Sequence, residues 1–250
     1  MNFPKPKKSL GQNFLKDKGI IKEMVSLLDI KKGEIVIEIG PGTGVITNYL
    51  LESGAQVIAV EYDESLADKL ENDYRGKDQI KIVSGSILDF SLTQLVNNKE
   101  YKLIGAIPYQ ITSPILHQIV EEKQRPERVV MIVQKELGKK VEGAEDRYSY
   151  LSNFVSIYYE ARCKKNIKPI AFYPKPKVDS TILILDKKDT SLEIDIRRFS
   201  RFLHKGFANP RKMIKKVFGE NVLSKANIKT TLRPQNIKLE EWIRLYELEQ

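Results

Sequence analysis

Short apolar runs alternate with amphipathic segments along the first part of this chain. Runs at 34–40, 56–61 and 80–85 have the length and composition of buried strands, and the segments at 44–54 and 64–74 repeat apolar residues with a helical period. This strand–helix order is typical of a parallel sheet that helices cover on both faces. The pattern therefore predicts an α/β fold.

The alternation continues and then stops near residue 187. Further strands are expected at 102–107, 128–133 and 180–186. A helix is expected at 113–122, and a long helix at 149–161 should run into a sixth strand. Beyond residue 186 only short amphipathic helices are expected, at 194–207, 210–219 and 239–249. We therefore predict two domains, residues 1–186 with the sheet and residues 187–250 with helices alone.

Composition excludes several classes of protein. No apolar run approaches the roughly 20 residues of a membrane span, and the N-terminal lysines precede no signal-peptide core, so we expect a cytoplasmic protein. A single cysteine, Cys163, rules out an internal disulfide. With His117 and His204 as the two histidines, a metal site is not expected. We expect a monomer.

The net charge of +9 is concentrated in two segments. Residues 197–216 contain eight basic residues and no acidic one, and residues 1–18 are also strongly basic. These two patches are typical of a protein that binds a polyanion such as a nucleic acid, although a solvated helix face is the alternative. The basic residues that we expect to contact RNA are Lys7, Lys8, Arg197, Arg201, Lys205, Arg211, Lys212, Lys215 and Lys216.

A glycine-rich turn follows the first predicted strand. In "VIEIGPGTG", Gly40, Gly42 and Gly44 are spaced for a tight turn that a ligand can approach closely. Glu61 ends the next strand, where a carboxylate can accept hydrogen bonds from two ribose hydroxyls. Together these features predict a nucleoside cofactor.

Spacing and charge favour S-adenosylmethionine over NAD. A dinucleotide fingerprint has its third glycine one position later, where this chain has Val45. The acidic Glu38, just before the turn, suits a cationic ligand better than a pyrophosphate. An NAD-linked oxidoreductase is therefore a remote alternative.

Six motifs along the chain resemble the ribosomal RNA adenine N6-dimethyltransferases. They are "KKSLGQNFL", "EIGPGTG", "IPY", "QKE", "FYPKPKVDS" and "FANPRKMIKK". The resemblance is strongest to the bacterial enzymes that modify small-subunit ribosomal RNA. It implies a Rossmann-like, S-adenosylmethionine-dependent methyltransferase sheet with a small helical RNA-binding domain, acting on the small ribosomal subunit or its RNA during ribosome assembly.

The resemblance also implies roles for individual residues. Asn13 and Leu15 would close over the cofactor, and Tyr109 and Phe172 would stack on a flipped-out adenine. The residues implied at the cofactor are Asn13, Leu15, Glu38, Gly40, Gly42, Gly44, Glu61, Ser86, Ile87 and Ala106. The implied catalytic set is Ala106, Ile107, Pro108, Tyr109 and Phe172.

Two positions depart from the family pattern. Ala106 replaces an asparagine whose side chain would accept a hydrogen bond from the target amino group, and Ser86 replaces an aspartate that would receive the cofactor adenine. The carbonyl of Ile107 would remain as the other acceptor. The sequence therefore leaves open a working methyltransferase, a catalytically impaired relative that acts as an rRNA-binding assembly factor, and an introduced substitution at position 106.

Overall fold

The computed structural model describes residues 4–144, 147–190 and 192–249, and for Lys8 it describes the backbone alone. The chain divides into two compact units, Met1–Gly138 with Arg162–Lys187 and Lys139–Ala161 with Lys188–Gln250. The boundary expected near residue 187 coincides with one of these divisions. Residues 139–161, expected in the first domain, group instead with the helical unit. The assignment of the units as separate functional domains remains a prediction.

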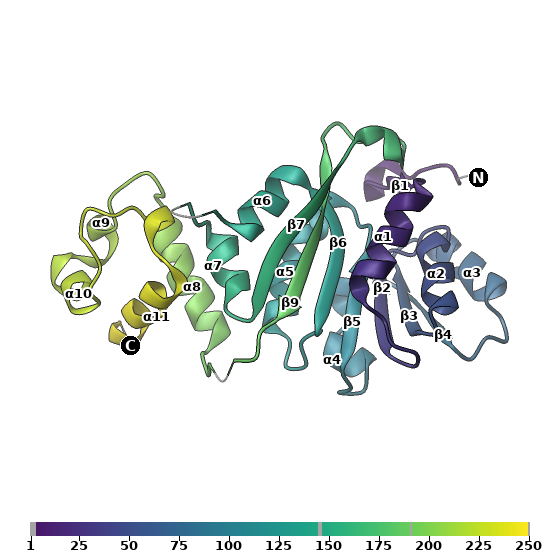
Figure 1. Cartoon of the computed structure of the whole chain (residues 1–250), viewed down its shortest axis with the longest axis horizontal. Helices are drawn as coiled ribbons and strands as arrows, with labels where there is room; N and C mark the ends of the chain where they lie inside the picture. The colour runs from purple at the N-terminus through teal and green to yellow at the C-terminus, as the bar shows by residue number, and fades with distance from the viewer. Residues whose placement is uncertain (1–3, 145–146, 191, 250) are drawn as a thin grey trace. The chain divides into compact units, whose positions relative to one another are not determined.

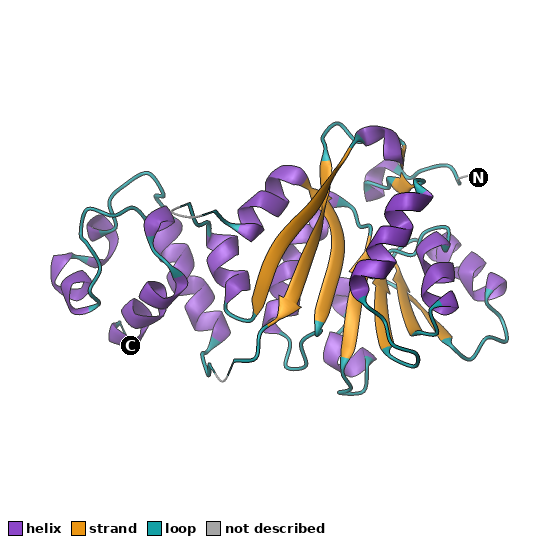
Figure 2. Cartoon of the chain, viewed as in Figure 1, coloured by secondary structure: helices purple, strands orange, loops and turns teal. Residues whose placement is uncertain are grey.

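Within the described residues, seven strands form one sheet in the order β4-β3-β2-β5-β6-β9-β7 (Figure 2). The strands are β2 (Ile35–Ile39), β3 (Gln56–Glu61), β4 (Ile80–Ser84), β5 (Tyr101–Gly105), β6 (Arg128–Gln134), β7 (Tyr159–Ile167) and β9 (Ser180–Lys187). The strands from β4 to β6 run parallel, and β9 pairs antiparallel with β6. The chain order reverses between β2 and β5, and ligands bind at such a switch point in open α/β sheets. The predicted α/β fold is confirmed.

Helices cover both faces of this sheet. The helices of the sheet unit are α1 (Lys18–Leu28), α2 (Val45–Glu52), α3 (Glu64–Asp73), α4 (Leu92–Leu95) and α5 (Thr112–Glu121). Figure 1 shows α1 in front of the sheet and α4 and α5 behind it. A separate two-stranded sheet pairs β1 (Phe14–Leu15) with β8 (Phe172–Tyr173), so the N-terminal segment is joined to a part of the chain more than 150 residues away.

The apolar core on the α1 side of the sheet explains the strand periodicity. Ile21, Met24 and Leu28 of α1 are fully buried against Val36 of β2 and Ile104 of β5. Alternate residues of each strand face this core, as the pleat requires. At about 25 cal/mol per Å² of apolar surface, such burial is the main favourable contribution to folding.

The helical unit is built around aromatic side chains. It contains α7 (Tyr150–Ser156), α8 (Ile196–Phe207), α9 (Lys215–Phe218), α10 (Glu220–Lys225) and α11 (Leu239–Leu248). Trp242 of α11 packs against Phe202 of α8 and Phe218 of α9, with ring centroids 6.0 and 6.1 Å apart. Gly206 leaves the space that the Trp242 ring fills, because an added Cβ would lie 2.3 Å from that ring.

Several predicted elements were wrong in extent. The helix expected at 149–161 ends at Ser156, and the strand β7 begins at Tyr159 because the aromatic pair Tyr158 and Tyr159 enters the sheet region. The helix expected at 210–219 is a single turn, α9. Further elements were not predicted from the sequence: the helices α1, α4, α6 (Lys135–Glu142) and α10, the short strands β1 and β8, and the 3₁₀ turns η1 (Lys8–Leu10), η2 (Ile87–Asp89), η3 (Tyr109–Ile111), η4 (Pro169–Ala171) and η5 (Pro234–Asn236).

One strand of the seven-stranded sheet, β2, contains a buried glutamate, Glu38. It has no exposed surface, and its Oε2 atom accepts a hydrogen bond from Oγ1 of Thr47 at 2.7 Å. Its Oε1 atom has no hydrogen-bond partner among the described residues. Burial, with a contribution from the nearby Glu61 carboxyl, raises the pKa of Glu38 to about 8. The folded protein therefore keeps Glu38 protonated at neutral pH.

This proton makes stability depend on pH. Between the ordinary pKa of 4.5 and the folded pKa of about 8, the folded chain holds a proton that the unfolded chain releases. The free energy of unfolding should therefore fall as the pH rises through this window, by about 1.4 kcal/mol per pH unit for this group. Glu38→Gln, which is neutral and similar in shape, should lose this slope. Urea unfolding at several pH values measures it.

The exposed Glu52 of α2 provides the control, because Glu52→Gln should leave the pH dependence unchanged. An equal pH slope in the wild type and in Glu38→Gln would contradict the assignment of a buried proton to Glu38.

Candidate functional site

The glycine-rich turn connects β2 to α2, and each of its three glycines has a positive φ. The values are 66° at Gly40, 57° at Gly42 and 76° at Gly44, a region that other residues rarely adopt. At Gly40 nothing lies within 4 Å of the position that a Cβ would take, so the main chain faces open space. At Gly44 a Cβ would meet the Tyr74 hydroxyl at 2.7 Å, which gives this glycine a packing role. The turn therefore presents bare backbone at Gly40.

Glu61 ends β3 beside this turn and is held by two backbone groups. Its Oε2 atom accepts from the N–H of Gly42 and its Oε1 atom accepts from the N–H of Asp63, each at 2.9 Å. Burial raises the pKa of Glu61, and these two hydrogen bonds act in the opposite direction. The backbone N–H of Tyr62 also interacts with this carboxyl. A carboxyl group has about four acceptor positions, so capacity for a ligand remains. A ligand with two adjacent hydroxyl groups fits this arrangement.

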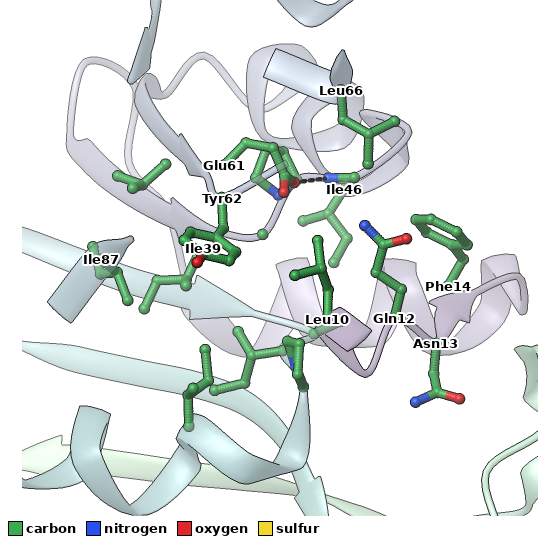
Figure 3. Close-up of a pocket in the computed structure, with 18 of the residues that line it drawn as sticks. Leu10, Gln12, Asn13, Phe14, Ile39, Ile46, Glu61, Tyr62, Leu66 and Ile87 are labelled. Atoms are coloured by element: carbon green, nitrogen blue, oxygen red, sulfur yellow. Dashed lines mark hydrogen bonds between the residues drawn. The ribbon is translucent and has the colours of Figure 1, made fainter. Parts of the chain in front are cut away.

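A cavity of about 600 Å³ opens beside these residues (Figure 3). Its volume is in the range of pockets that hold cofactor-sized ligands. The loops after β2, β3, β4 and β5 line it together with the N-terminal segment. The residues that line it from β2 and β3, from the loops after β2, β3 and β4, and from α3 include Ile39, Gly40, Gly42, Thr43, Val60, Glu61, Tyr62, Leu66, Ser86, Ile87 and Asp89.

The loop after β5 lines the same cavity with Ala106, Ile107 and Pro108. Ala106 offers a methyl group that packs partly on the core. Among the described residues, no turn or loop hydrogen bond ends on the carbonyl oxygen of Ile107. This loop therefore presents an unoccupied backbone acceptor and lacks the side-chain acceptor of the family pattern.

The loop after β4 contributes Ser86 and Ile87. The hydroxyl of Ser86 caps η2 by accepting from the N–H of Leu88 at 3.3 Å, so its capacity for a ligand is partly used. Ile87 is 4% exposed and presents an apolar surface to the cavity. The carboxylate of Asp89 lies on the same rim.

The N-terminal segment forms another wall. Asn13, Phe14 and Leu15 line the cavity, with the Phe14 ring 3.2 Å from the Cβ position of Gly42. Figure 3 shows the Gln12 and Asn13 side chains pointing in opposite directions. The Asn13 amide donates to the carbonyl of Gly11 at 2.9 Å, which shapes the segment itself.

The structure brings most of the predicted site residues to one cavity. Those that line it are Asn13, Leu15, Gly40, Gly42, Glu61, Ser86, Ile87, Ala106, Ile107 and Pro108. Their roles toward a ligand remain predictions.

Four predicted residues lie elsewhere. Glu38 faces Thr47 in the core, and Gly44 packs under Tyr74. Phe172 is 3% exposed and belongs to the apolar core, because its pairing with Leu15 turns it inward. Tyr109 does not line the cavity; it is half-buried, and its hydroxyl lies 2.6 Å from Oγ of Ser180. Burial raises the pKa of Tyr109.

The basic residues predicted to contact RNA differ in their surroundings. Some form ion pairs with acidic side chains, and others are exposed. The Lys7 ammonium forms an ion pair with Asp63 at 2.6 Å, so its charge is already partnered, and its role as an RNA contact stays a prediction. The side chain of Lys8 lies outside the described residues. Lys205 and Lys215 pair with Glu249 and Glu220. On α8 the apolar residues turn inward. The exposed basic residues include Arg197 and Arg201 on α8, Arg211 and Lys212 in the following loop, and Lys216 on α9.

The described residues were also compared with the expectations about metal sites and membrane spans. No group of three or more His, Cys, Asp or Glu side chains there is arranged to hold a metal ion. None of the described helices has the length and apolar character needed to cross a membrane.

Gln12 and Tyr62 line the cavity but were missed by the sequence analysis. Tyr62 directly follows Glu61 at the carboxyl end of a parallel strand, and this position was a usable signal. Gln12 had no local signal, because its partner Asp63 lies 51 positions away.

Comparison with known proteins identifies the family. The family described as ribosomal RNA adenine dimethylase matches residues 4–249. The ribosomal RNA small subunit methyltransferase A of Francisella tularensis subsp. novicida is 36% identical over 252 positions, covering 96% of each chain. The crystal structure of the 23S rRNA methyltransferase ErmE is 27% identical with a TM-score of 0.75, covering 95% of this chain and 100% of that one.

A crystal structure of a dimethyladenosine transferase from Plasmodium falciparum shares the fold, with a TM-score of 0.84 at 22% identity over 94% of this chain and 97% of that one. The match to the family extends over nearly the whole length of the sequence and includes both the glycine-rich turn and the loop after β5. The chain therefore belongs to the ribosomal RNA adenine dimethylase family.

Proposed function

We propose that this protein transfers methyl groups from S-adenosylmethionine to the N6 atoms of adenosines in small-subunit ribosomal RNA. The observation that carries the proposal is that one cavity is lined both by the glycine-rich turn with Glu61 and by the Ala106–Pro108 loop. A cofactor and an acceptor base could therefore meet in one cavity. The 36% identity to a small subunit methyltransferase favours that RNA as the substrate.

The cofactor end of the cavity suits S-adenosylmethionine. The open backbone at Gly40 leaves room for the amino-acid part, and the Glu61 carboxylate keeps acceptor capacity for the ribose hydroxyls. Tyr62 and Ile87 would bracket the adenine ring. When bound, the cofactor supplies the methyl group. Ser86 can accept one hydrogen bond where the family pattern has a carboxylate.

The opposite end suits an adenine amino group. The Ile107 carbonyl would accept one N–H of the base and orient the nitrogen toward the methyl group. The N6 lone pair is delocalised into the ring, so this orientation lowers the barrier to attack. Ala106 supplies no second acceptor. The base would have to leave its helix to enter, and Tyr109, which directly follows Pro108 of the cavity-lining loop and whose hydroxyl is hydrogen-bonded to Ser180, would stack on it.

The helical unit would hold the RNA. Arg201, Arg211 and Lys212 are exposed and have no acidic partner among the described residues. Such cations grip phosphates and carry little sequence information. We propose that the protein acts as a monomer in the cytoplasm, on partly assembled small subunits.

Methyl transfer should be detectable and limited by Ala106. The protein is incubated with S-adenosylmethionine carrying a labelled methyl group and with small subunits that lack the modification, and label is counted in N6-dimethyladenosine. Ala106→Asn should raise the rate by about tenfold to a hundredfold, because it adds a preorganised acceptor. Ala106→Leu introduces an apolar side chain of a size similar to asparagine, and it should not raise the rate.

Absence of transfer by the wild type, with transfer restored in Ala106→Asn, would contradict the proposal and identify an rRNA-binding factor. If Ala106→Leu raised the rate as much as Ala106→Asn, the gain would come from the larger side chain and not from a hydrogen-bond acceptor.

Binding to small subunits should weaken as salt rises. The triple variant Arg201→Ala, Arg211→Ala, Lys212→Ala should bind less tightly, and the slope of log K against log salt should shrink by roughly 0.7 to 0.9 for each lost phosphate contact. Filter binding at several salt concentrations measures both effects. The control replaces three exposed lysines of the sheet unit, Lys32, Lys99 and Lys123. Equal slopes for the two triple variants would contradict the assignment.

A further inference from the structure

Asp63 is the N-cap residue of α3, and its side chain accepts more hydrogen bonds than a helix cap needs. Its Oδ1 atom accepts from Nζ of Lys7 at 2.6 Å and from the backbone N–H and hydroxyl of Ser65 at 3.2 and 2.6 Å. Its Oδ2 atom accepts from Nε2 of Gln12 at 2.9 Å. The cap uses only Ser65, so the contacts to Lys7 and Gln12 serve something other than helix initiation.

These contacts join two parts of the chain that are far apart in sequence. Lys7 and Gln12 belong to the N-terminal segment, and they also bind each other, because the N–H of Lys7 donates to Oε1 of Gln12 at 2.8 Å. Asp63 is 3% exposed, whereas Lys7 is 49% exposed, so the ammonium reaches down to a carboxylate within the protein. Burial alone would raise the pKa of Asp63, but the hydrogen bonds from Lys7, Ser65 and Gln12 lower it to about 2.

The same segment is fixed at its other end. Phe14 and Leu15 pair with β8, and the N–H of Lys16 donates to the carbonyl of Ala171 at 2.9 Å. Between the two attachments the chain passes along the cavity, which it lines from Ser9 onward. The segment is therefore a strap with an anchor at each end, and the Asp63 anchor is made of side chains alone.

The Asp63 anchor is also connected directly to the ribose-binding carboxylate. The backbone N–H of Asp63 donates to Oε1 of Glu61 at 2.9 Å. A shift of Asp63 would therefore move both the strap and one of the two groups that orient Glu61.

We propose that Asp63 is a positioning residue that fastens the strap, residues 7–15, across the cavity and thereby slows release of the bound nucleoside. The inference rests on the proposed function, because it takes the cavity to be the cofactor site. It assigns to Lys7 and Gln12 the role of a side-chain latch. Breaking the latch should free the strap while the β1–β8 anchor and the helix cap stay in place.

Lys7→Met tests the latch without touching the cap or the cavity wall. Hydrogen exchange of residues 7–15, measured without ligand, should become faster. The dissociation rate of S-adenosylhomocysteine, measured by stopped flow, should rise about tenfold, whereas Lys7→Arg should behave like the wild type. Lys5→Met, which removes a charge from an exposed lysine two positions earlier, is the matched control.

Asp63→Asn gives an independent check, because asparagine can still cap α3 but carries no charge for Lys7. It should reproduce both effects of Lys7→Met. The latch would be overturned if S-adenosylhomocysteine binds and Lys7→Met leaves exchange and dissociation unchanged, or if Lys5→Met has an equal effect. Failure of the wild type to bind S-adenosylhomocysteine would instead overturn the proposed function, and with it the role of the latch in nucleoside release.

Discussion

The arrangement of the site depends on the hydrogen bonds that the Glu61 carboxylate accepts from two backbone N–H groups. This carboxylate sits at the end of β3 and is held by backbone N–H groups of Gly42, in the turn after β2, and of Asp63, at the start of α3. Two neighbouring loops are thereby fixed against one charged group. Because both donors are main-chain groups, the fold itself sets this arrangement, and Glu61 lines the cavity. Glycine suits position 42 because its φ is 57° and because a Cβ there would press on the Phe14 ring at 3.2 Å.

The two proposed ends of the cavity, for the cofactor and for the base, differ in how many polar groups they offer to a ligand. At the cofactor end, a rigid turn, a doubly held carboxylate and a strap anchored at Asp63 surround the space. At the base end, the backbone acceptor at Ile107 remains but Ala106 contributes only a methyl group. Of the two departures from the family pattern, Ser86 is expected to weaken cofactor binding, because its hydroxyl already caps η2, and Ala106 is expected to lower the rate of transfer, because it supplies no second acceptor.

Local patterns in the sequence were enough for the sheet and the glycine-rich turn. The elements between residues 34 and 85 were predicted to within about two residues, because strand and helix periods and turn residues are local properties. Side-chain direction was not local. Glu38 was assigned to the ligand and Phe172 to the base, yet both face cores that depend on tertiary packing. The ion pair of Lys7 with Asp63 could not be predicted either, because the two residues are 56 positions apart.

The most direct test is the affinity for S-adenosylhomocysteine of the wild type and of Glu61→Gln, measured by isothermal titration calorimetry. Loss of the charged acceptor should raise Kd by roughly tenfold to a hundredfold, which corresponds to about 1.5–3 kcal/mol for hydrogen bonds to a charged group. Glu71→Gln, on the exposed surface of α3, should bind like the wild type. Equal affinities for the wild type and a folded Glu61→Gln protein would contradict the account, because the carboxylate would then not hold the ribose.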